Sequence, residues 1–135
     1  IRTSSPIRHL SIVSGGRFVY SRPLGEGNIL RYTPGSDQWA KVLDLTSSEG
    51  DPRYSPSGKW IAFSSNRNGP KTVFRMRRDG TGMRAVSFLK GFSGSPSWSP
   101  DEQWIAFDSA PEGFTEVFAT RVSDGTLRKL ARGYM

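Results

Sequence analysis

One stretch of the sequence occurs twice, and it limits the fold more than any other feature. Residues 51–63 read DPRYSPSGKWIAF, and residues 95–107 read SPSWSPDEQWIAF. The two copies share a Ser-Pro turn and the run Trp-Ile-Ala-Phe, and they align without a gap at an offset of 44 residues. A period of about 40 to 45 residues with several short strands per unit is typical of β-propeller blades. The sequence therefore predicts an all-β fold built from repeated blades.

A third, degenerate copy precedes these two. Residues 14–21 (SGGRFVYS) align with residues 57–64 (SGKWIAFS) at an offset of 43 residues, with Arg17 in place of the tryptophan. The chain has 135 residues, the size of one ordinary domain. We therefore expect a single domain, residues 1–135, with three blades at residues 7–46, 51–90 and 95–133.

Each blade is expected to contain four short antiparallel strands. The expected inner strands are 8–13, 52–55 and 96–99, the second strands 17–21, 60–64 and 104–108, the third strands 29–33, 72–77 and 116–122, and the outer strands 38–43, 83–88 and 127–131. The second strands are almost entirely apolar, which suits strands covered on both faces by neighbouring blades. A plain antiparallel sandwich is the alternative, but it has no reason to repeat Trp-Ile-Ala-Phe after the same turn.

The Ser-Pro turn, the Trp-Ile-Ala-Phe strand, a later Val-Phe pair and an Asp-Gly turn together resemble the TolB-type β-propeller repeat. The resemblance is strong over residues 51–131 and weaker over residues 7–43. Repeats of this type occur in the periplasmic protein TolB, in the propellers of prolyl-oligopeptidase-type and tricorn-type proteases, and in sensor regions of bacterial membrane-bound regulators. The resemblance implies a fold, but a repeat with so many roles does not imply one function.

The number of blades leaves the complete architecture open. Families with this repeat close into rings of about six or more blades, whereas this chain supplies three. Two copies related by a two-fold axis would form a six-bladed ring, which predicts a homodimer. Alternatively the chain is a piece of a larger propeller. The first residue is Ile1 rather than methionine, which indicates a processed or excised sequence.

Few residues are candidates for catalysis. The chain has no cysteine, which excludes disulfides, thiol catalysis and zinc–thiolate sites, and its single histidine is His9. No Gly-x-Ser-x-Gly nucleophile motif is present. We expect His9 to be structural, and we expect Asp51, Asp79, Asp101 and Asp124 to close turns rather than to bind calcium. The sequence thus predicts a protein that is not an enzyme and has no cofactor or metal.

The candidate ligand site consists of basic and polar residues. A net charge of +7 favours an acidic partner, although scattered charge also serves solubility alone. In a propeller, the loops after the second strands share a rim with the links between blades. The candidate ligand-binding residues at this rim and beside the channel are Arg22, Asp51, Arg53, Asn66, Arg67, Lys71, Lys90 and Ser97. Trp60 and Trp104 are expected in the core, whereas a ligand role stays open for Tyr54 and Trp98.

These features predict a non-enzymatic binding or assembly module that presents a basic rim to an acidic protein or peptide. The alternatives are a gating propeller of a serine peptidase and a sensor domain of a membrane-bound regulator. A nucleic-acid partner is not expected. No stretch reaches the roughly 18 apolar residues of a membrane span. The resemblance implies a periplasmic or extracellular location in a bacterium.

Overall fold

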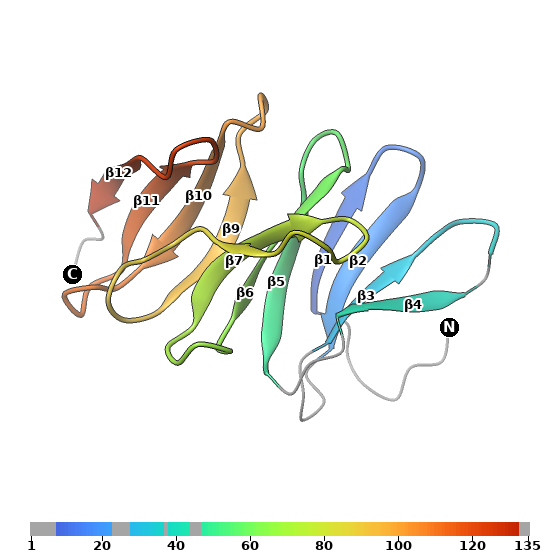
Figure 1. Ribbon diagram of the computed structural model, residues 1–135, viewed down its shortest axis with the longest axis horizontal. Helices are drawn as coiled ribbons and strands as arrows, with labels where there is room; N and C mark the ends of the chain where they lie inside the picture. Colours follow the sequence, from blue (N-terminus) through green and yellow to red (C-terminus); the bar gives the residue numbers. More distant parts are fainter. Residues whose placement is uncertain (1–7, 23–27, 37, 44–46, 133–135) are drawn as a thin grey trace.

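The computed structural model describes residues 8–22, 28–36, 38–43 and 47–132, and at Arg8, Arg22 and Asn28 it describes the backbone alone. These residues form three four-stranded antiparallel sheets and no helix. The sheets stand side by side, with the first drawn in blue and cyan, the second in green and yellow, and the third in orange and red (Figure 1). The expected all-β architecture of propeller blades is confirmed.

In each sheet the strands are hydrogen-bonded in the order of the sequence. Blade 1 contains β1 (Arg8–Val13), β2 (Arg17–Arg22), β3 (Asn28–Tyr32) and β4 (Trp39–Leu43). Blade 2 contains β5 (Glu49–Tyr54), β6 (Trp60–Ser65), β7 (Thr72–Arg77) and β8 (Arg84–Ala85). Blade 3 contains β9 (Ser93–Trp98), β10 (Trp104–Ser109), β11 (Glu116–Arg121) and β12 (Leu127–Arg132).

The inner strands β5 and β9 begin earlier than the sequence predicts, because each contains a bulge. The pairing register shifts between Gly50 and Arg53 in blade 2, and a matching shift interrupts the pairing of β9 with β10. The bulge disrupts the alternating pattern that marks a strand, so the residues before it are not recognised as strand. The outer strand β8 is also shorter than expected, with only two residues.

The blades pack through two different faces. Val19 and Ile29 of blade 1 belong to one buried cluster with Ile61, Phe63 and Phe74 of blade 2. A second buried cluster joins smaller side chains of blade 2, namely Ala62, Val73 and Val86, to Ile105, Phe107 and Phe118 of blade 3. A face of small aliphatic side chains therefore contacts an aromatic face of the next blade at both junctions.

The outward face of blade 3 repeats the small aliphatic pattern without a covering blade. Val117 occupies the position of Val73 in the repeat, yet it is 38% exposed whereas Val73 is fully buried. At the other end, blade 1 carries the aromatic residues Phe18, Tyr32 and Trp39, whose rings contact one another. The two ends of the chain thus carry the two complementary kinds of face.

Candidate functional site

The carboxylate of Asp51 is the centre of a polar cluster at the inner edge of the blades. Asp51 lies at the bulge of β5 and not in a turn, so the expectation that it closes a turn is wrong. Its φ is 52°, a conformation that Asp adopts more readily than most residues. Its Oδ2 accepts a hydrogen bond from Ser64 Oγ at 2.8 Å and lies 3.5 Å from Lys71 Nζ. Its Oδ1 lies 2.7 Å from His9 Nδ1 of blade 1. Asp51 therefore joins its own blade to the preceding one.

The surroundings of Asp51 favour its ionised form. Burial alone would raise its pKa, but the hydrogen bond from Ser64, the charges of Lys71 and His9, and the main-chain amide of Ser95 together lower the pKa below its ordinary value. The Ser95 amide belongs to blade 3. One carboxylate thus interacts with all three blades.

His9, Asp51 and Ser95 occupy the same position in their blades, and we call them the bulge residues. All three have a positive φ, of 53°, 52° and 49° respectively. Such a conformation is strained for a residue other than glycine, so it persists only where the surrounding structure holds it in place. Here the neighbouring bulge residues supply the contacts.

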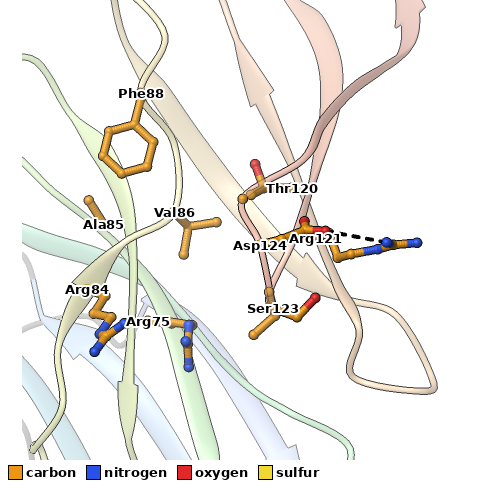
Figure 2. Close-up of a pocket in the computed structure, with 11 residues that line it drawn as sticks. Arg75, Arg84, Ala85, Val86, Phe88, Thr120, Arg121, Ser123 and Asp124 are labelled. Atoms are coloured by element: carbon orange, nitrogen blue, oxygen red, sulfur yellow. Dashed lines mark hydrogen bonds and ion pairs between the residues drawn. The ribbon is translucent and has the colours of Figure 1, made fainter.

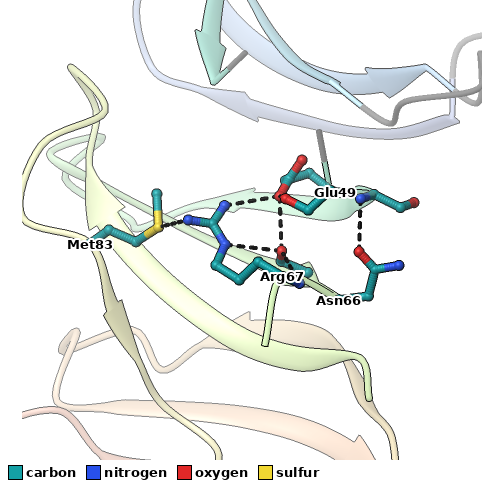
Figure 3. Close-up of polar contacts among 7 residues, drawn as sticks. Glu49, Asn66, Arg67 and Met83 are labelled. Atoms are coloured by element: carbon teal, nitrogen blue, oxygen red, sulfur yellow. Dashed lines mark hydrogen bonds and ion pairs between the residues drawn. The ribbon is translucent and has the colours of Figure 1, made fainter. Parts of the chain in front are cut away.

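A second polar cluster surrounds Glu49 at the start of β5 (Figure 3). Arg67 Nη2 lies 2.9 Å from Glu49 Oε1, and the hydroxyl groups of Ser65 and Ser47 donate to the same oxygen at 2.8 and 2.6 Å. The Arg67 guanidinium also lies over the ring of Phe74, 5.0 Å from its centroid, and contacts the sulfur of Met83. Arg67 is consequently enclosed by its own blade.

Each of the two repeated tryptophan rings lies within reach of two arginine side chains. The guanidinium groups of Arg75 and Arg77 lie 4.7 and 5.4 Å from the ring centroid of Trp60. Arg121 and Arg128 make the equivalent contacts with Trp104, at 5.1 and 4.7 Å. Both tryptophans are half-buried, and neither belongs to the buried clusters of the described residues. The expected core position of Trp60 and Trp104 is therefore wrong, because the first residue of the strand lies at the blade edge, within reach of the arginines.

Within the described part of the chain, no three His, Asp or Glu side chains are close enough to share a metal ion. The same residues include no helix with the length and apolarity needed to cross a membrane.

Comparison with known proteins agrees with this geometry. Residues 19–134 match the family model of the TolB beta propeller domain. The chain belongs to the TolB β-propeller family. An uncharacterized protein of Agrobacterium fabrum is 41% identical over 46 residues, which cover 32% of this chain and 16% of that protein.

The TolB fold also appears in the structural matches. The structure of a putative TolB from Agrobacterium tumefaciens has a TM-score of 0.84 at 21% identity, covering 98% of this chain and 54% of that one. TolB from Acinetobacter baumannii has a TM-score of 0.79 at 20% identity, covering 94% of this chain and 33% of that one. The chain thus spans between a third and about half of these TolB structures.

The TolB-type topology brings some of the predicted ligand-binding residues together. Asp51 and Lys71 form one ion pair. Arg67 lies in the separate Glu49 cluster, and Asn66 accepts a hydrogen bond from the main-chain amide of Ser48 at 2.9 Å. These contacts give both side chains a structural role, and their predicted role in ligand binding stays a prediction.

The remaining predicted residues differ in accessibility. Arg53 is half-buried, and its Nη1 donates to the carbonyl oxygen of Leu10 at 3.3 Å. Ser97 and Lys90 are exposed. The side chain of Arg22 lies outside the described residues.

Some contacts of the TolB-type repeat are not predicted by the sequence. His9 was expected to be structural, but its contact with Asp51 was not foreseen. An ungapped alignment at the offset of 43 residues places His9 against Pro52. Only the strand pairing of the structure, in which the turn of blade 1 is one residue shorter, brings His9 to the position of Asp51. Trp98, for which a ligand role stayed open, donates its indole N–H to the carbonyl oxygen of Arg53 at 3.1 Å and so links two blades.

Proposed function

We propose that this chain is part of a non-enzymatic β-propeller that binds an acidic protein or peptide segment at its basic rim. One main-chain contact supports the proposal most directly. The amide of Ser93 donates to the carbonyl oxygen of Lys71 at 2.7 Å, which fixes the β8–β9 link beside the β6–β7 loop. Lys90 lies on that link, and Lys71 lies on that loop. Two cationic side chains are therefore carried by adjoining segments of the same rim.

The proposed mechanism is rigid display. Blade packing and the clusters around Asp51 and Glu49 hold the rim loops in a fixed arrangement before a partner arrives. A preorganised surface loses less conformational entropy on binding than a flexible one. Exposed cations at the rim then attract an acidic segment and orient it.

We also propose that the ring is completed outside this chain, either by a second copy or by the rest of a longer propeller. The complementary aliphatic and aromatic faces at the two ends of the chain support both forms of the proposal. For its location we propose the periplasm or the extracellular space of a bacterium, in keeping with the TolB-type repeat.

Binding to an octaglutamate peptide tests the rim proposal. The labelled peptide is titrated with the protein at low salt, and fluorescence anisotropy is recorded for the wild type and for Lys90→Glu and Lys71→Gln. Both variants should bind the peptide several-fold more weakly, because each loses a rim cation. Lys59→Glu is the matched control, since Lys59 is exposed on the β5–β6 turn rather than on the rim. Equal weakening by all three variants would refute a rim site.

A gating propeller of a serine peptidase is the second candidate. The crystal structure of the tricorn protease has a TM-score of 0.72 at 19% identity over 96% of this chain and 13% of that one. Such a similarity concerns the fold alone. A hydrolase domain with a Gly-x-Ser-x-Gly motif in the same polypeptide would favour this candidate, whereas a membrane span and a DNA-binding domain would favour a sensor.

A further inference from the structure

A groove of about 480 Å³ lies between the outer edges of blades 2 and 3 (Figure 2). One wall is formed by Arg75 on β7 and by Arg84, Ala85 and Phe88 on β8 and the link after it. The opposite wall is the β11–β12 hairpin, residues 120–125. The volume falls within the range of protein sites for small ligands and peptide side chains, about 300 to 1,000 Å³.

The groove is open because the outer strand of blade 2 ends early. After Ala85 the amides of Val86 and Ser87 both point to the carbonyl oxygen of Val73, at 2.8 and 3.4 Å. The hydroxyl group of Ser87 accepts the hydrogen bond from the Val73 amide at 3.0 Å. The chain then leaves the sheet, and Phe88 is left 83% exposed at the end of the groove. Together with Ala85 and Val86, Phe88 gives the groove an apolar section on which an apolar side chain of a partner can pack.

The wall from blade 2 carries uncompensated positive charge. Among the residues that the structure describes, no ion pair joins Arg75 or Arg84 to a carboxylate. Burial desolvates Arg75, and the like charges of Arg84 and Arg77 add to this effect, so the pKa of Arg75 is lowered. The opposite wall differs, because Arg121 there lies 3.5 Å from Asp124. An anionic group placed between Arg75 and Arg84 would relieve the repulsion between them.

We infer that this groove binds an extended segment of a partner protein in which acidic residues alternate with large apolar ones. Carboxylates of the segment pair with Arg84 and Arg75, whose planar guanidinium groups bind carboxylates with two hydrogen bonds. An apolar side chain of the segment packs on Phe88 and Ala85. A nucleic-acid strand is the competing occupant, and the test below separates it from the peptide. The two arginines of the groove lie on β7 and β8, whereas Lys71 and Lys90 of the proposed rim site lie on the β6–β7 loop and the β8–β9 link, so the charged groups of the two sites are different.

The test uses a labelled peptide of sequence Gly-Asp-Leu-Glu-Phe-Asp-Gly and its uncharged counterpart Gly-Asn-Leu-Gln-Phe-Asn-Gly. Fluorescence anisotropy measures the binding of each to the wild type, Arg84→Glu and Phe88→Ser. The acidic peptide should bind the wild type, and each variant should weaken its binding about tenfold or more, because one loses the charge and the other the apolar contact. The uncharged peptide should bind much more weakly than the acidic one.

The control is Arg128→Glu, which reverses an exposed arginine at the equivalent outer-strand position of blade 3, away from the groove. It should leave binding of the acidic peptide within about twofold of the wild type. The proposal is overturned if Arg128→Glu weakens binding as much as Arg84→Glu does, if the two peptides bind equally, or if Phe88→Ser has no effect.

Displacement of the peptide by a single-stranded oligonucleotide at the same concentration would instead assign the groove to nucleic acid. Lys90→Glu is expected to leave binding of this acidic peptide unchanged. The rim proposal and the groove proposal can therefore be refuted independently of each other.

Discussion

The imidazole of His9 and the carboxylate of Asp51 meet across the junction of blades 1 and 2, with 2.7 Å between Nδ1 and Oδ1. Both residues lie at the bulge of an inner strand, at the same position of the repeat. Because Asp51 also interacts with the amide of Ser95, the bulges of three successive blades are connected through one carboxylate. This connection makes the junctions sensitive to the charge of a single side chain.

Replacing this carboxylate should change how stability depends on pH. The pKa of Asp51 is lower in the folded chain than in the unfolded chain, so its contribution is present above the unfolded-state pKa and is lost as the pH falls through the folded-state pKa. Asp51→Asn should therefore lower the free energy of unfolding at pH 7 by roughly 1 to 3 kcal/mol. The difference in the free energy of unfolding between Asp51→Asn and the wild type should become smaller below about pH 4. Urea denaturation at pH 7 and pH 3 measures both values. Glu112→Gln is the control: it removes an exposed carboxylate and should have the same free energy of unfolding as the wild type at both pH values.

Loss of the Arg67 guanidinium should destabilise the fold. The side chain of Glu49 is fully buried, and that of Arg67 is only 19% exposed. Arg67→Ala would leave a buried carboxylate without its ionic partner, which typically costs about 3 to 5 kcal/mol. Lys90→Ala, at an exposed position, should change stability by less than about 0.5 kcal/mol. Chemical denaturation of both variants and the wild type measures the free energy of unfolding of each. An Arg67→Ala protein as stable as the wild type would show that the ion pair has no structural role.

The two Asp-Gly hairpin turns should respond differently to alanine. Gly80 and Gly125 both have a positive φ, of 89° and 74°, so alanine strains either turn. A Cβ on Gly80 would also lie 2.8 Å from the carbonyl oxygen of Val42 in blade 1, whereas a Cβ on Gly125 would meet nothing within 4 Å. Gly80→Ala should be the less stable variant by at least about 1 kcal/mol, or about 4 °C in melting temperature. Equal melting temperatures would mean that the turn moves away from blade 1 without cost.

Aspartate in place of Val73 and of Val117, the equivalent residues of blades 2 and 3, tests which blade face is covered by a neighbour. Val73→Asp places a charge in the buried junction of blades 2 and 3 and should prevent stable folding. Val117→Asp places it on the exposed face of blade 3 and should leave the fold of a single chain intact. If a second copy covers that face, Val117→Asp should also reduce the mass measured by light scattering from a dimer to a monomer. A wild-type monomer that Val117→Asp leaves unchanged would argue against closure by a second copy.

The repeat made most of the fold predictable. The alignment of Trp-Ile-Ala-Phe with its copy places apolar residues at matching positions of β6 and β10, and a blade must pack in the same way on each neighbour. The bulges and the short β8 were not predictable in this way. They depend on hydrogen bonds such as those of Ser87 with Val73, which leave no periodic pattern in the sequence.

The candidate site was predictable only in part. Loop position alone placed Lys71 near Asp51, because the topology of a blade brings the β6–β7 loop to the start of β5. It did not show that Glu49 and the ring of Phe74 enclose Arg67, since these contacts depend on side-chain direction. The sequence does not predict the arginines beside Trp60 and Trp104 for the same reason: Arg75 and Arg77 are separated from Trp60 by a whole loop.

The bulge residues have the same backbone conformation in every blade but a different side chain in each. His9, Asp51 and Ser95 share one backbone conformation, but they offer an imidazole, a carboxylate and a hydroxymethyl group. Duplication of a blade would reproduce the backbone and hence the place where two blades meet. A substitution at this one position then changes the side chain that a blade offers at the junction, as the contact of His9 with Asp51 illustrates, so a single residue can make the junctions of an otherwise uniform repeat chemically different.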